Sequence, residues 1–352
     1  MALELTPRTL MGPGPSDVHP RILEAVGKMT IGHLDPQFVN LMEEIKSLLK
    51  YSFKTKNEMT YTVSAPGSAG METCFVNLVS PGDKVLVCIN GVFGKRMLEN
   101  VTRIGGVPVV LEFPWGKSVD PQKVEDELKK DSMIKIVSFV HGETSTGVLS
   151  DAESIAKISR QYDCLTIVDT VTSFVGTPLE VDNWGLDAVY TGSQKCLSCI
   201  PGLSPVTFSK RALEKFDQRK TPVQSWFLDI SLIKNYWGKG EKRTYHHTAP
   251  VNSLYALYES LLIVKEEGLE NCWDRHLKNH LKLKEGLSHL GLDFLVDEKD
   301  RTPQLNAIRV PEGVDEAKVR GKLLNEFNLE IGAGLGPLAG KIWRIGLMGH
   351  SS

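Results

Sequence analysis

A lysine and an aspartate each stand at the end of a short apolar run, and together they suggest chemistry on an aldehyde cofactor. Lys195 follows the run Ala188–Thr191 and the residues Gly-Ser-Gln, and Asp169 closes the run Leu165–Asp169. A lysine in half-apolar surroundings loses its proton readily and can form a Schiff base with an aldehyde. An aspartate beside such a lysine is the group that keeps a pyridine nitrogen protonated. Pyridoxal phosphate is the cofactor that needs both groups.

Each of these residues also has a simpler interpretation. A lysine is usually a solvated surface charge, but Lys195 is followed by Cys-Leu-Ser-Cys-Ile-Pro, which favours partial burial. Asp169 alone could equally cap the loop that follows its strand. Both residues, however, come at the carboxyl ends of predicted strands, which is the edge where open α/β sheets bind their ligands. The position therefore favours a shared site over two unrelated charges.

A third segment offers a place for a phosphate group. Residues Ser64–Glu72 read Ser-Ala-Pro-Gly-Ser-Ala-Gly-Met-Glu, and these small residues open a helix that continues toward Val79. Unpaired N–H groups and the helix dipole make such an N-terminus attractive to anions. The segment does not match the nucleotide P-loop pattern, which excludes that kind of site. Taken alone, the glycine-rich turn is equally typical of an ordinary helix start.

Two residue pairs invite a metal interpretation that their surroundings do not support. Cys196 and Cys199 have C-x-x-C spacing, but no second pair or neighbouring histidine completes four zinc ligands. His246 and His247 are adjacent in sequence, so their side chains point in different directions, and no cysteine or carboxylate cluster accompanies them. We therefore expect no metal site.

The elements that must position these residues alternate between about residues 60 and 210. Short runs rich in Val, Ile or Leu are separated by helix-like segments, which is typical of a largely parallel sheet covered by helices on both faces. Ser150-Asp-Ala-Glu153 reads as a capping box that opens one of these helices, with Ile155 and Ile158 turned inward. The predicted strands are Lys84–Ile89, Val107–Phe113, Ile134–Val140, Leu165–Asp169 and Ala188–Thr191.

From about residue 250 the pattern changes to longer helices and then to strands. We predict two domains: residues 1–250 form an N-terminal segment and a large α/β domain, and residues 251–352 form a smaller α+β domain. The KGEKR cluster at Lys239–Arg243 is expected to be a solvated loop. The predicted elements of the second domain are helices over Ser253–Glu267 and Trp273–Leu290 and strands over Leu305–Val310 and Arg344–Met348.

Composition and charge exclude several classes of protein. The 41 Lys and Arg residues against 43 Asp and Glu give a formal net charge of −2, and no segment is basic enough to neutralise a row of phosphates. We therefore expect no nucleic-acid partner and no anionic membrane surface as a partner. With 41% hydrophobic and 24% charged residues, the chain of 352 residues is typical of a globular protein with a sizeable core.

No run approaches the roughly 18–20 apolar residues of a membrane span, and the first residues lack the basic and then apolar order of a signal peptide. The six cysteines lie mostly inside apolar runs, as small buried hydrophobes do, rather than in a disulfide framework. The sequence therefore predicts a cytoplasmic protein in a reducing compartment.

Seven motifs follow one another along nearly the whole chain. They are Met11-Gly-Pro-Gly-Pro-Ser16, Ile31-Gly-His-Leu-Asp-Pro36, His141-Gly-Glu-Thr-Ser-Thr-Gly147, Val168-Asp-Thr170, Gly192-Ser-Gln-Lys195, Tyr245-His-His-Thr248 and Trp343-Arg-Ile-Gly346. This set resembles the class V aminotransferases, which are fold type I pyridoxal-phosphate enzymes, and most of all the alanine–glyoxylate group. The resemblance implies a mostly parallel, seven-stranded type of sheet in the large domain.

Carried over motif by motif, the resemblance implies roles for individual residues. Lys195 would be the Schiff-base lysine and Asp169 the partner of the pyridine nitrogen. Phe93 would stack on the pyridine ring, although a core phenylalanine is the alternative, and Thr144 would contact the hydroxyl side of that ring. The other residues expected to bind the cofactor within one chain are Gly67 and Ser68 at the phosphate, with Ala69, Thr170, Val171, Ser193 and Gln194.

The resemblance also implies a second subunit and a place for the substrate. Tyr245 and Thr248 would reach the phosphate bound by the neighbouring subunit, so the protein is expected to be a homodimer with shared sites. Arg344 would bind the substrate carboxylate, because a guanidinium fork matches a carboxylate with two hydrogen bonds. A surface arginine is the alternative, which the apolar neighbours of Arg344 disfavour. The other residues expected near the substrate are Gly14 and His33.

The implied activity is a ping-pong transfer of an amino group from alanine or serine to glyoxylate, giving glycine. Small amino and keto acids are expected because the resemblance places Gly332, Gly334 and Gly336 and the loop at residues 31–36 near the pocket. The alternative is (S)-ureidoglycine–glyoxylate transamination, because relatives with that activity resemble residues 336–346. Those relatives carry amide side chains at the positions of His33 and Tyr245, and the absence of amides here favours alanine or serine.

Two further alternatives are disfavoured. Cysteine desulfuration, another class V chemistry, would need a mobile cysteine near the pocket, and the region after residue 272 contains none. A non-catalytic relative that binds without turnover would not need to retain both Lys195 and Asp169. The family continues into C-terminal helices after the strand at Arg344, so we expect the second domain to be truncated at Ser352.

Overall fold

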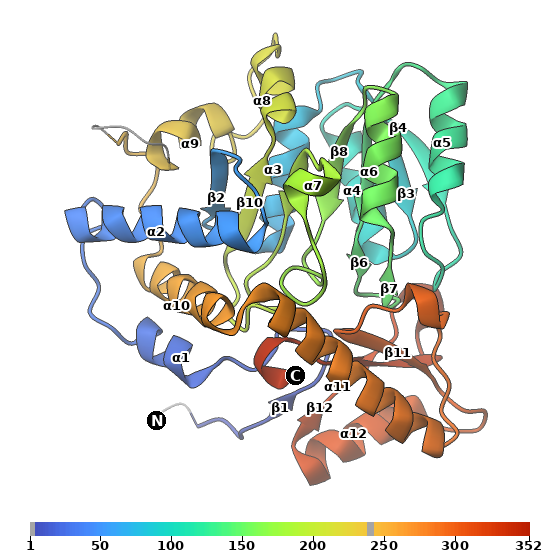
Figure 1. Cartoon of the computed structure of the whole chain (residues 1–352). Coiled ribbons are helices and arrows are strands. Elements are labelled where there is room, and N and C mark those ends of the chain that lie inside the picture. The colour runs from blue at the N-terminus through green and yellow to red at the C-terminus, as the bar shows by residue number, and fades with distance from the viewer. Residues whose placement is uncertain (1–3, 238–242) are drawn as a thin grey trace.

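A seven-stranded sheet forms the centre of the molecule (Figure 1). The computed structural model describes residues 4–237 and 243–352. Neighbouring strands pair in parallel except β10, which is antiparallel to both β2 and β9. The five strands expected from apolar runs are confirmed, as is the mostly parallel α/β fold. In sheet order the strands are β2 (Met59–Val63), β10 (Ser204–Phe208), β9 (Ala188–Tyr190), β8 (Leu165–Asp169), β5 (Ile134–Val140), β3 (Lys84–Ile89) and β4 (Val107–Glu112).

Helices cover both faces of this sheet. Every residue of β2, β8, β9 and β10 is buried, which requires cover on each face because successive side chains point to opposite sides. Strand β4 lies at one edge and leaves Val107 and Val110 exposed. The helices of this part of the chain are α3 (Gly67–Leu78), α4 (Val92–Arg103), α5 (Pro121–Lys130), α6 (Ala152–Gln161), α7 (Val181–Trp184), α8 (Lys210–Asp217) and α9 (Ile230–Trp237).

The start of α6 differs from the predicted capping box. Asp151, not Ser150, is the N-cap residue, and its side chain accepts the N–H of Ser154 at 3.0 Å. The hydroxyl of Ser150 instead accepts the N–H of Val119 at 3.3 Å. Aspartate and serine are equally good N-caps, so the local pattern cannot choose between them. The helix itself is confirmed, with Ile155 buried.

The carboxyl ends of β3, β5, β8 and β9 meet at one edge of the sheet because these strands are parallel. A short hairpin, β6 (Gly142–Glu143) with β7 (Val148–Leu149), follows β5 at this edge. The N–H of His141 donates to the carbonyl of Asp169 at 2.9 Å and ties the start of the hairpin to the end of β8. In Figure 1 this hairpin faces the C-terminal part of the chain.

The C-terminal part of the chain combines long helices with a small sheet. The predicted helices and strands are present with shifted ends, and the last strand begins and ends two residues earlier than expected. Strand β14 lies between β11 and β13 and is antiparallel to both. The elements are α10 (Val251–Glu267), α11 (Leu269–His289), β11 (Leu305–Arg309), α12 (Glu316–Phe327), β12 (Leu329–Glu330), β13 (Gly332–Ala333) and β14 (Ile342–Gly346), with single 3-10 turns at Glu298–Asp300, Gly336–Leu338 and Gly349–Ser351.

The N-terminal segment runs between the two parts. Strand β1 (Thr9–Leu10) pairs in parallel with β12, and helices α1 (Pro20–Val26) and α2 (Pro36–Ser52) pack against α10. The amide of Asn252 on α10 donates to the carbonyl of Val26 at 2.8 Å. Helix α10 therefore contacts residues on both sides of position 250, and the division of the chain into residues 1–250 and 251–352 stays a prediction.

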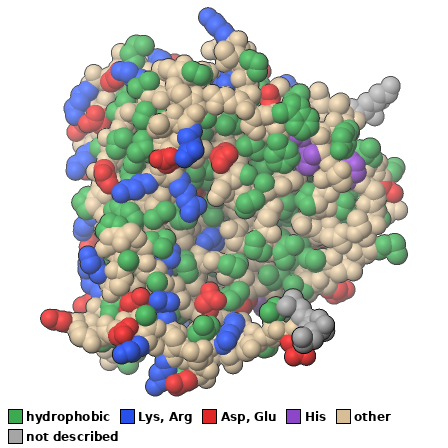
Figure 2. All heavy atoms as spheres, turned by 180° about the vertical axis from the view of Figure 1, so that it is seen from behind, with side chains coloured by type: hydrophobic (Ala, Val, Ile, Leu, Met, Phe, Trp, Pro, Cys, Tyr) green, Lys and Arg blue, Asp and Glu red, His purple; other side chains and the backbone are tan. Residues whose placement is uncertain are grey.

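The basic cluster at 239–243 lies outside the described residues except for its last member. Arg243 is not solvated as expected: its side chain is 8% exposed, forms an ion pair with Glu43 and donates to the carbonyl of Tyr236 at 2.8 Å. On the face shown in Figure 2, positive and negative side chains are interspersed, and histidines lie among hydrophobic side chains. Within the described ranges, no helix has the length and apolarity needed to cross a membrane.

Candidate active site

Lys195 lies in the loop after β9 and is buried at the carboxyl edge of the sheet. The residue is 8% exposed, and its Nζ donates to the carbonyl of Pro13 in the N-terminal segment. Burial, together with the positive charge of Arg344, lowers the pKa of Lys195 to about 8. A lysine in this state is partly neutral near physiological pH, so the half-buried ammonium expected from its neighbours is more deeply buried than the sequence indicated.

The N-terminal segment packs directly on this lysine. Gly14 has φ +104°, and a Cβ added there would lie 2.5 Å from Nζ and 2.6 Å from Cδ of Lys195. The hydroxyl of Ser16 donates to the carbonyl of Lys195 at 2.7 Å. A Cβ on Gly332 would likewise overlap Pro13. Residues 13–16 therefore form one wall of the lysine site, with glycines where backbone and side chain meet.

Asp169 ends β8 and is 2% exposed. Its Oδ1 accepts the N–H of Val171 at 2.8 Å, and its Oδ2 accepts the hydroxyl of Tyr190 at 2.8 Å. Burial raises the pKa of Asp169 to about 7, helped by the negative charge of Glu143 and opposed by these two hydrogen bonds and by Lys195. The carboxyl group can therefore share a proton with a basic partner near neutral pH.

The sequence interpretation did not include Tyr190. It ends β9, and strand register places it directly beside Asp169 on β8. A register argument could have found it, because both residues close neighbouring parallel strands. Tyr190 is fully buried, and burial raises the pKa of its hydroxyl well above the ordinary value, with Asp169 adding to this effect. Tyr190 therefore stays protonated and donates to Asp169.

Helix α3 begins where the sequence predicted, without a capping side chain. Pro66 precedes it and provides no side-chain hydrogen bond to the first turn. A Cβ on Gly67 would lie 3.4 Å from Val171 Cγ2 and 3.6 Å from Gly192 Cα, so this N-terminus points at the loops after β8 and β9. An uncapped N-terminus in this position is suited to an anion.

Other residues expected at the cofactor surround this N-terminus. Within the described part of the chain, the Oε1 of Gln194 is buried and has no hydrogen-bond partner. The N–H of Ala69 already donates to Pro66 at 2.7 Å. The hydroxyls of Thr170 and Ser193 donate to the carbonyls of Tyr190 and Ile200, at 2.9 and 2.7 Å. Gln194 thus has a free acceptor, whereas the Thr170 and Ser193 hydroxyls already bind backbone.

Arg344 lies on β14 and faces the large sheet. The residue is 6% exposed, its Nε donates to the carbonyl of Ala333 at 2.7 Å, and its Nη1 donates to the carbonyl of Thr144 at 3.2 Å. Burial lowers the pKa of Arg344 to about 10, opposed by the charge of Glu143. The group remains a cation at neutral pH. Two of its five N–H groups hold it in place, which leaves others for a carboxylate.

Phe93 and Thr144 also lie at this edge. Phe93 is in the first turn of α4, half-buried against the main core, with the guanidinium of Arg96 centred 4.7 Å from its ring. The hydroxyl of Thr144 is hydrogen-bonded to that of Thr172 in the loop after β8. Lys195, Asp169, Arg344, Phe93 and Thr144 therefore come from separate segments to one edge of the sheet.

A second group of expected residues lies apart from this centre. Tyr245 is 58% exposed, and its ring centre is 5.5 Å from that of His33 in an edge-to-face contact. Thr248 is exposed as well. His247 Nε2 is hydrogen-bonded at 2.7 Å to the hydroxyl of Ser64, just before the start of α3. Tyr245 and Thr248 therefore face solvent in the single chain.

The cysteine pair and the histidine pair singled out in the sequence are engaged in the protein interior or with each other. Cys196 and Cys199 are both buried, and burial raises the pKa of each thiol to about 12. His246 Nδ1 lies 2.7 Å from His247 Nδ1, so each histidine binds the other. In the ranges that the structure describes, no group of three or more His, Cys, Asp or Glu could hold a metal ion.

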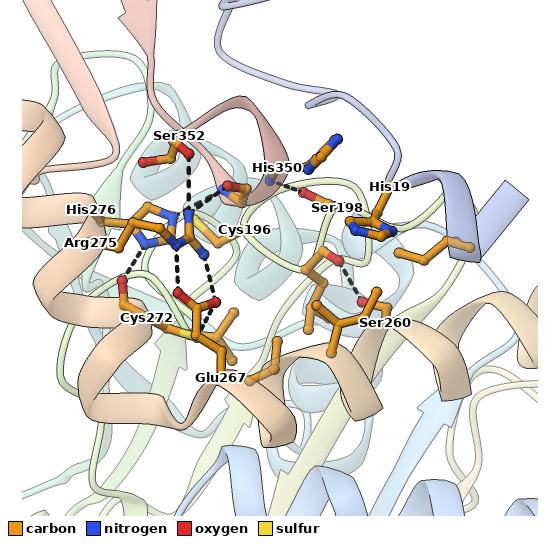
Figure 3. A pocket seen from close by; sticks show the side chains of 16 residues that line it. His19, Cys196, Ser198, Ser260, Glu267, Cys272, Arg275, His276, His350 and Ser352 are labelled. Atoms are coloured by element: carbon orange, nitrogen blue, oxygen red, sulfur yellow. Dashed lines mark hydrogen bonds and ion pairs between the residues drawn. The ribbon is translucent and has the colours of Figure 1, made fainter.

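A cavity of about 280 Å³ lies beside the loop that follows Lys195, without Lys195 in its lining (Figure 3). Two of its lining residues, Glu267 and Arg275, form an ion pair at 2.5 Å, and Arg275 also donates to the carbonyl of Gly349 at 2.7 Å. The N–H of His350 donates to the hydroxyl of Ser198 at 2.5 Å. These contacts tie the last residues of the chain to α11 and to the lysine loop.

The sequence resembles a known protein family and individual proteins along nearly its whole length. The model described as aminotransferase class-V matches residues 17–340. An alanine–glyoxylate aminotransferase of Mus musculus is 40% identical over 353 residues, covering 99% of this chain and 85% of the mouse protein. The chain belongs to the class V aminotransferase family. Enzymes of this family use pyridoxal 5'-phosphate, and the protein is an aminotransferase that depends on this cofactor.

Solved structures of aminotransferases resemble it along the whole chain. An alanine–glyoxylate aminotransferase from Nostoc sp. is 45% identical with a TM-score of 0.97, covering 100% of this chain and 92% of its own. A ureidoglycine–glyoxylate aminotransferase from Bacillus subtilis is 39% identical with the same TM-score of 0.97, covering 100% of this chain and 90% of its own. The fold type I architecture is thus confirmed.

The residues present fit pyridoxal 5'-phosphate. The edge of the sheet carries an amine of lowered pKa, a buried carboxyl group of raised pKa and an uncapped helix N-terminus, which suit an aldehyde, a pyridine nitrogen and a phosphate. Gln194 adds a buried acceptor with no partner in the described chain. Each kind of group that the cofactor requires is therefore present at this edge.

Proposed function

We propose that the protein transfers an amino group from alanine or serine to glyoxylate and so produces glycine. The observation that carries this proposal is the meeting of Lys195, Asp169 and Arg344, all buried, at one edge of an aminotransferase fold. The similarity to alanine–glyoxylate and ureidoglycine–glyoxylate aminotransferases supports glyoxylate as the acceptor. Glyoxylate and small amino acids each have a carboxylate and little or no side chain, which suits a site lined by glycines.

In this proposal the cofactor is held at both of its ends. Gly67 and Ser68 would receive the phosphate at the start of α3, where the helix dipole favours an anion, and Ala69 would lie beside it with its N–H directed to the carbonyl of Pro66. Asp169 receives the ring nitrogen, and Tyr190 orients Asp169 by its hydrogen bond at 2.8 Å. The remaining residues we assign to this cofactor are Phe93, Thr144, Thr170, Val171, Ser193 and Gln194.

When bound, the cofactor supplies an aldehyde carbon that exchanges amino groups and a ring that accepts electrons from the substrate α-carbon. Lys195 would be the residue that holds the aldehyde carbon of the cofactor and, when its amine is free, would accept the proton of the substrate α-carbon. Its pKa near 8 suits this role, because an amine that titrates close to neutral pH both takes and returns a proton. Asp169, as a carboxylate, would accept a hydrogen bond from the ring nitrogen and so keep that nitrogen protonated.

Arg344 holds the carboxylate that both substrates share. Its Nε and Nη1 are fixed by the carbonyls of Ala333 and Thr144, so the remaining N–H groups present a prepared fork. Gly14 lies against Lys195 and limits the room beside the substrate. Because the same arginine serves donor and acceptor in turn, we propose a ping-pong reaction in which the first keto acid leaves before glyoxylate binds.

We propose that two copies of the chain form a homodimer with shared sites. Tyr245 and Thr248 are exposed in the single chain, although polar and aromatic residues in a family motif are expected to have a partner. In the dimer they reach the phosphate held at Gly67 of the other copy. His33 contacts Tyr245 through its ring, so it would serve the same neighbouring site.

A panel of amino donors tests the proposed substrates. Purified enzyme with bound cofactor is given alanine, serine, aspartate or glutamate, with glyoxylate or pyruvate as acceptor, and glycine or alanine formation is measured. We expect alanine and serine with glyoxylate to give kcat/KM values at least about tenfold above the dicarboxylic donors. A preference for aspartate or glutamate, or no glycine formation with any donor, would overturn the proposal.

(S)-Ureidoglycine is the second candidate donor, supported by the Bacillus subtilis structure with its TM-score of 0.97. Here the two positions that favour alanine or serine, His33 and Tyr245, contact each other, and His33 Nδ1 lies 3.3 Å from the hydroxyl of Tyr236. An aromatic pair offers fewer donors and acceptors to a ureido group than two amides would. Faster turnover with ureidoglycine than with alanine would favour the alternative.

A further inference from the structure

Glu143 is fully buried beside the site, although none of the roles proposed above involves it. It is the second residue of β6. Its Oε2 accepts the N–H of Phe93 at 3.1 Å, and its Oε1 accepts the N–H and hydroxyl of Ser145 at 3.0 and 2.5 Å. A buried carboxylate with this many donors is fixed in one orientation.

The contact with Phe93 replaces a missing helix cap. Gly91 is the N-cap of α4 and has no side chain to accept the free N–H groups of the first turn. A Cβ on Gly91 would lie 2.3 Å from Glu143 Cδ and 2.4 Å from Ser145 Oγ, so these two side chains fill the place of a cap. Ser145 Oγ also accepts the N–H of Val92 at 3.0 Å.

The position of the Phe93 ring depends on this cap. Phe93 is the second residue of α4, and Glu143 accepts its N–H, so a frayed first turn would move the ring with the backbone. On one side the guanidinium of Arg96 covers the ring at 4.7 Å. A phenylalanine has no polar tip to anchor it, so backbone and packing alone set its place.

The same segment also reaches the other groups of the site. Thr144, between Glu143 and Ser145, accepts Nη1 of Arg344 on its carbonyl at 3.2 Å. Strand pairing with Val148 keeps Glu143 in the β6–β7 hairpin. The residues from 143 to 145 therefore link the start of α4 to the arginine that faces the substrate.

The charged groups buried at this edge of the sheet also agree with a role for Glu143 in the site. Lys195 and Arg344 bring two cations to the edge of the sheet, and Asp169 and Glu143 bring two carboxyl groups. Glu143 raises the pKa of Asp169 and opposes the lowering of the pKa of Arg344. Its charge is therefore felt at both groups, in addition to its hydrogen bonds.

We propose that Glu143 is a positioning residue that fixes the Phe93 ring against the cofactor by capping helix α4 from the β6 hairpin. This inference rests on the proposed function, in which Phe93 stacks on the cofactor ring. Glu143 does not touch the reacting atoms and acts through Phe93.

A double-mutant cycle between these two residues tests the inference. Glu143→Gln keeps the size of the side chain, but its amide offers one acceptor and one donor group, so it cannot accept from Phe93 and Ser145 together. Phe93→Leu keeps apolar volume and removes the ring face. Glu153→Gln is the matched control, because Glu153 is exposed on α6. The dissociation constant of pyridoxal phosphate is measured with cofactor-free protein for the parent, both single variants, the double variant and the control.

We expect each single variant at 143 and 93 to raise that dissociation constant about five- to tenfold, which corresponds to the loss of one aromatic stacking contact. The dissociation constant of the double variant should rise no more than about tenfold above that of the parent, because Glu143 acts through the ring that Phe93→Leu removes. The visible circular dichroism of the bound cofactor should decrease alike in all three. Glu153→Gln should keep the parent's affinity and dichroism.

Additive effects, about 25- to 100-fold in the double variant, or parent-like affinity and dichroism in Glu143→Gln, would overturn the inference. If the parent itself does not bind pyridoxal phosphate, the proposed function fails instead. Thermal unfolding of the cofactor-free variants checks that they are folded. If Glu143→Gln is unfolded, Ser145→Ala replaces it, because it removes half of the cap and keeps the carboxylate. The effects of Ser145→Ala and Phe93→Leu on the dissociation constant are then expected to be non-additive, and additive effects of these two variants would overturn the inference equally.

Discussion

Replacing Gly14 by alanine should disable the enzyme by displacing Lys195 rather than by unfolding the chain. A Cβ at position 14 would lie 2.5 Å from Nζ, 2.6 Å from Cδ and 2.8 Å from Cε of the lysine. Carbon atoms pack at about 3.5–4.0 Å, so Lys195 must move by roughly 1 Å. A displacement of about 1 Å at a reacting group can cost about a hundredfold in rate, or about 2.7 kcal/mol of barrier. We therefore expect kcat to fall about a hundredfold.

Backbone strain must be separated from this effect. Gly14 has φ +104°, so alanine there costs about 1–3 kcal/mol of stability whatever its surroundings. Gly82 is the matched control: its φ is +86°, a Cβ there meets nothing within 4 Å, and it lies before β3, away from the carboxyl edge of the sheet. Gly82→Ala should lose only the stability that backbone strain costs and keep its rate within about threefold, or under 1 kcal/mol of barrier.

The assay is single-turnover reaction with alanine at a temperature where both variants are folded, alongside thermal unfolding of each. In a Lys195→Ala background the alanine at 14 has no side chain to displace, so its stability cost should shrink to that of Gly82→Ala. If Gly14→Ala reacts as fast as the parent, or if Gly82→Ala is equally slow, the N-terminal segment does not position the lysine.

Four other changes test the remaining residues. Asp169→Asn should retain some cofactor and lose most of the rate, because a neutral amide cannot stabilise a protonated ring nitrogen; a rate within about threefold of the parent, under ~1 kcal/mol of barrier, would leave Asp169 a loop cap. Arg344→Lys should lower kcat/KM for alanine and glyoxylate together, by about ten- to 150-fold, and an unchanged preference for alanine over a matching amine without the carboxylate would contradict its role. Mixing Lys195→Ala subunits with subunits altered at Tyr245 and Thr248 should restore activity, since each heterodimer has one complete site, and inactive heterodimers would indicate a site within one chain. Lys195→Met should flatten the pH dependence of unfolding of the cofactor-free protein between about pH 8 and 10.5. The pKa of Lys195 is about 8 in the folded chain and lies below its ordinary value of 10.5, so the parent gains stability as pH rises through this window, by at most about 3 kcal/mol. A parent curve that is already flat would contradict the burial of the charge.

The sequence predicts the strands and the site edge because both depend on local patterns. Runs of Val, Ile and Leu mark buried parallel strands, and Lys195 and Asp169 follow two of them directly. Their meeting is then a consequence of parallel pairing. The antiparallel strand β10 carries no comparable signal, since its direction is set by the chain returning from the lysine loop.

Contacts between distant segments could not be predicted in this way. The wall that Pro13 and Gly14 form on Lys195 joins residues about 180 positions apart, and backbone hydrogen bonds of Met11 to Glu330 and Gly346 hold this wall in the C-terminal part of the chain. Glu143 reads as an ordinary residue of a hairpin until the missing side chain at Gly91 is seen beside it. Tyr190 lies between these cases, because strand register alone places it beside Asp169.

The central claim is that Lys195 carries out amino transfer on bound pyridoxal phosphate at this edge of the sheet. The most direct measurement is the visible absorbance of the cofactor in the purified protein on addition of alanine and then of glyoxylate, compared with Lys195→Ala. We predict that the parent loses its visible band with alanine and regains it with glyoxylate, whereas Lys195→Ala binds the cofactor without this cycle. A parent whose spectrum alanine leaves unchanged, or a Lys195→Ala variant that completes the cycle as fast as the parent, would contradict the account.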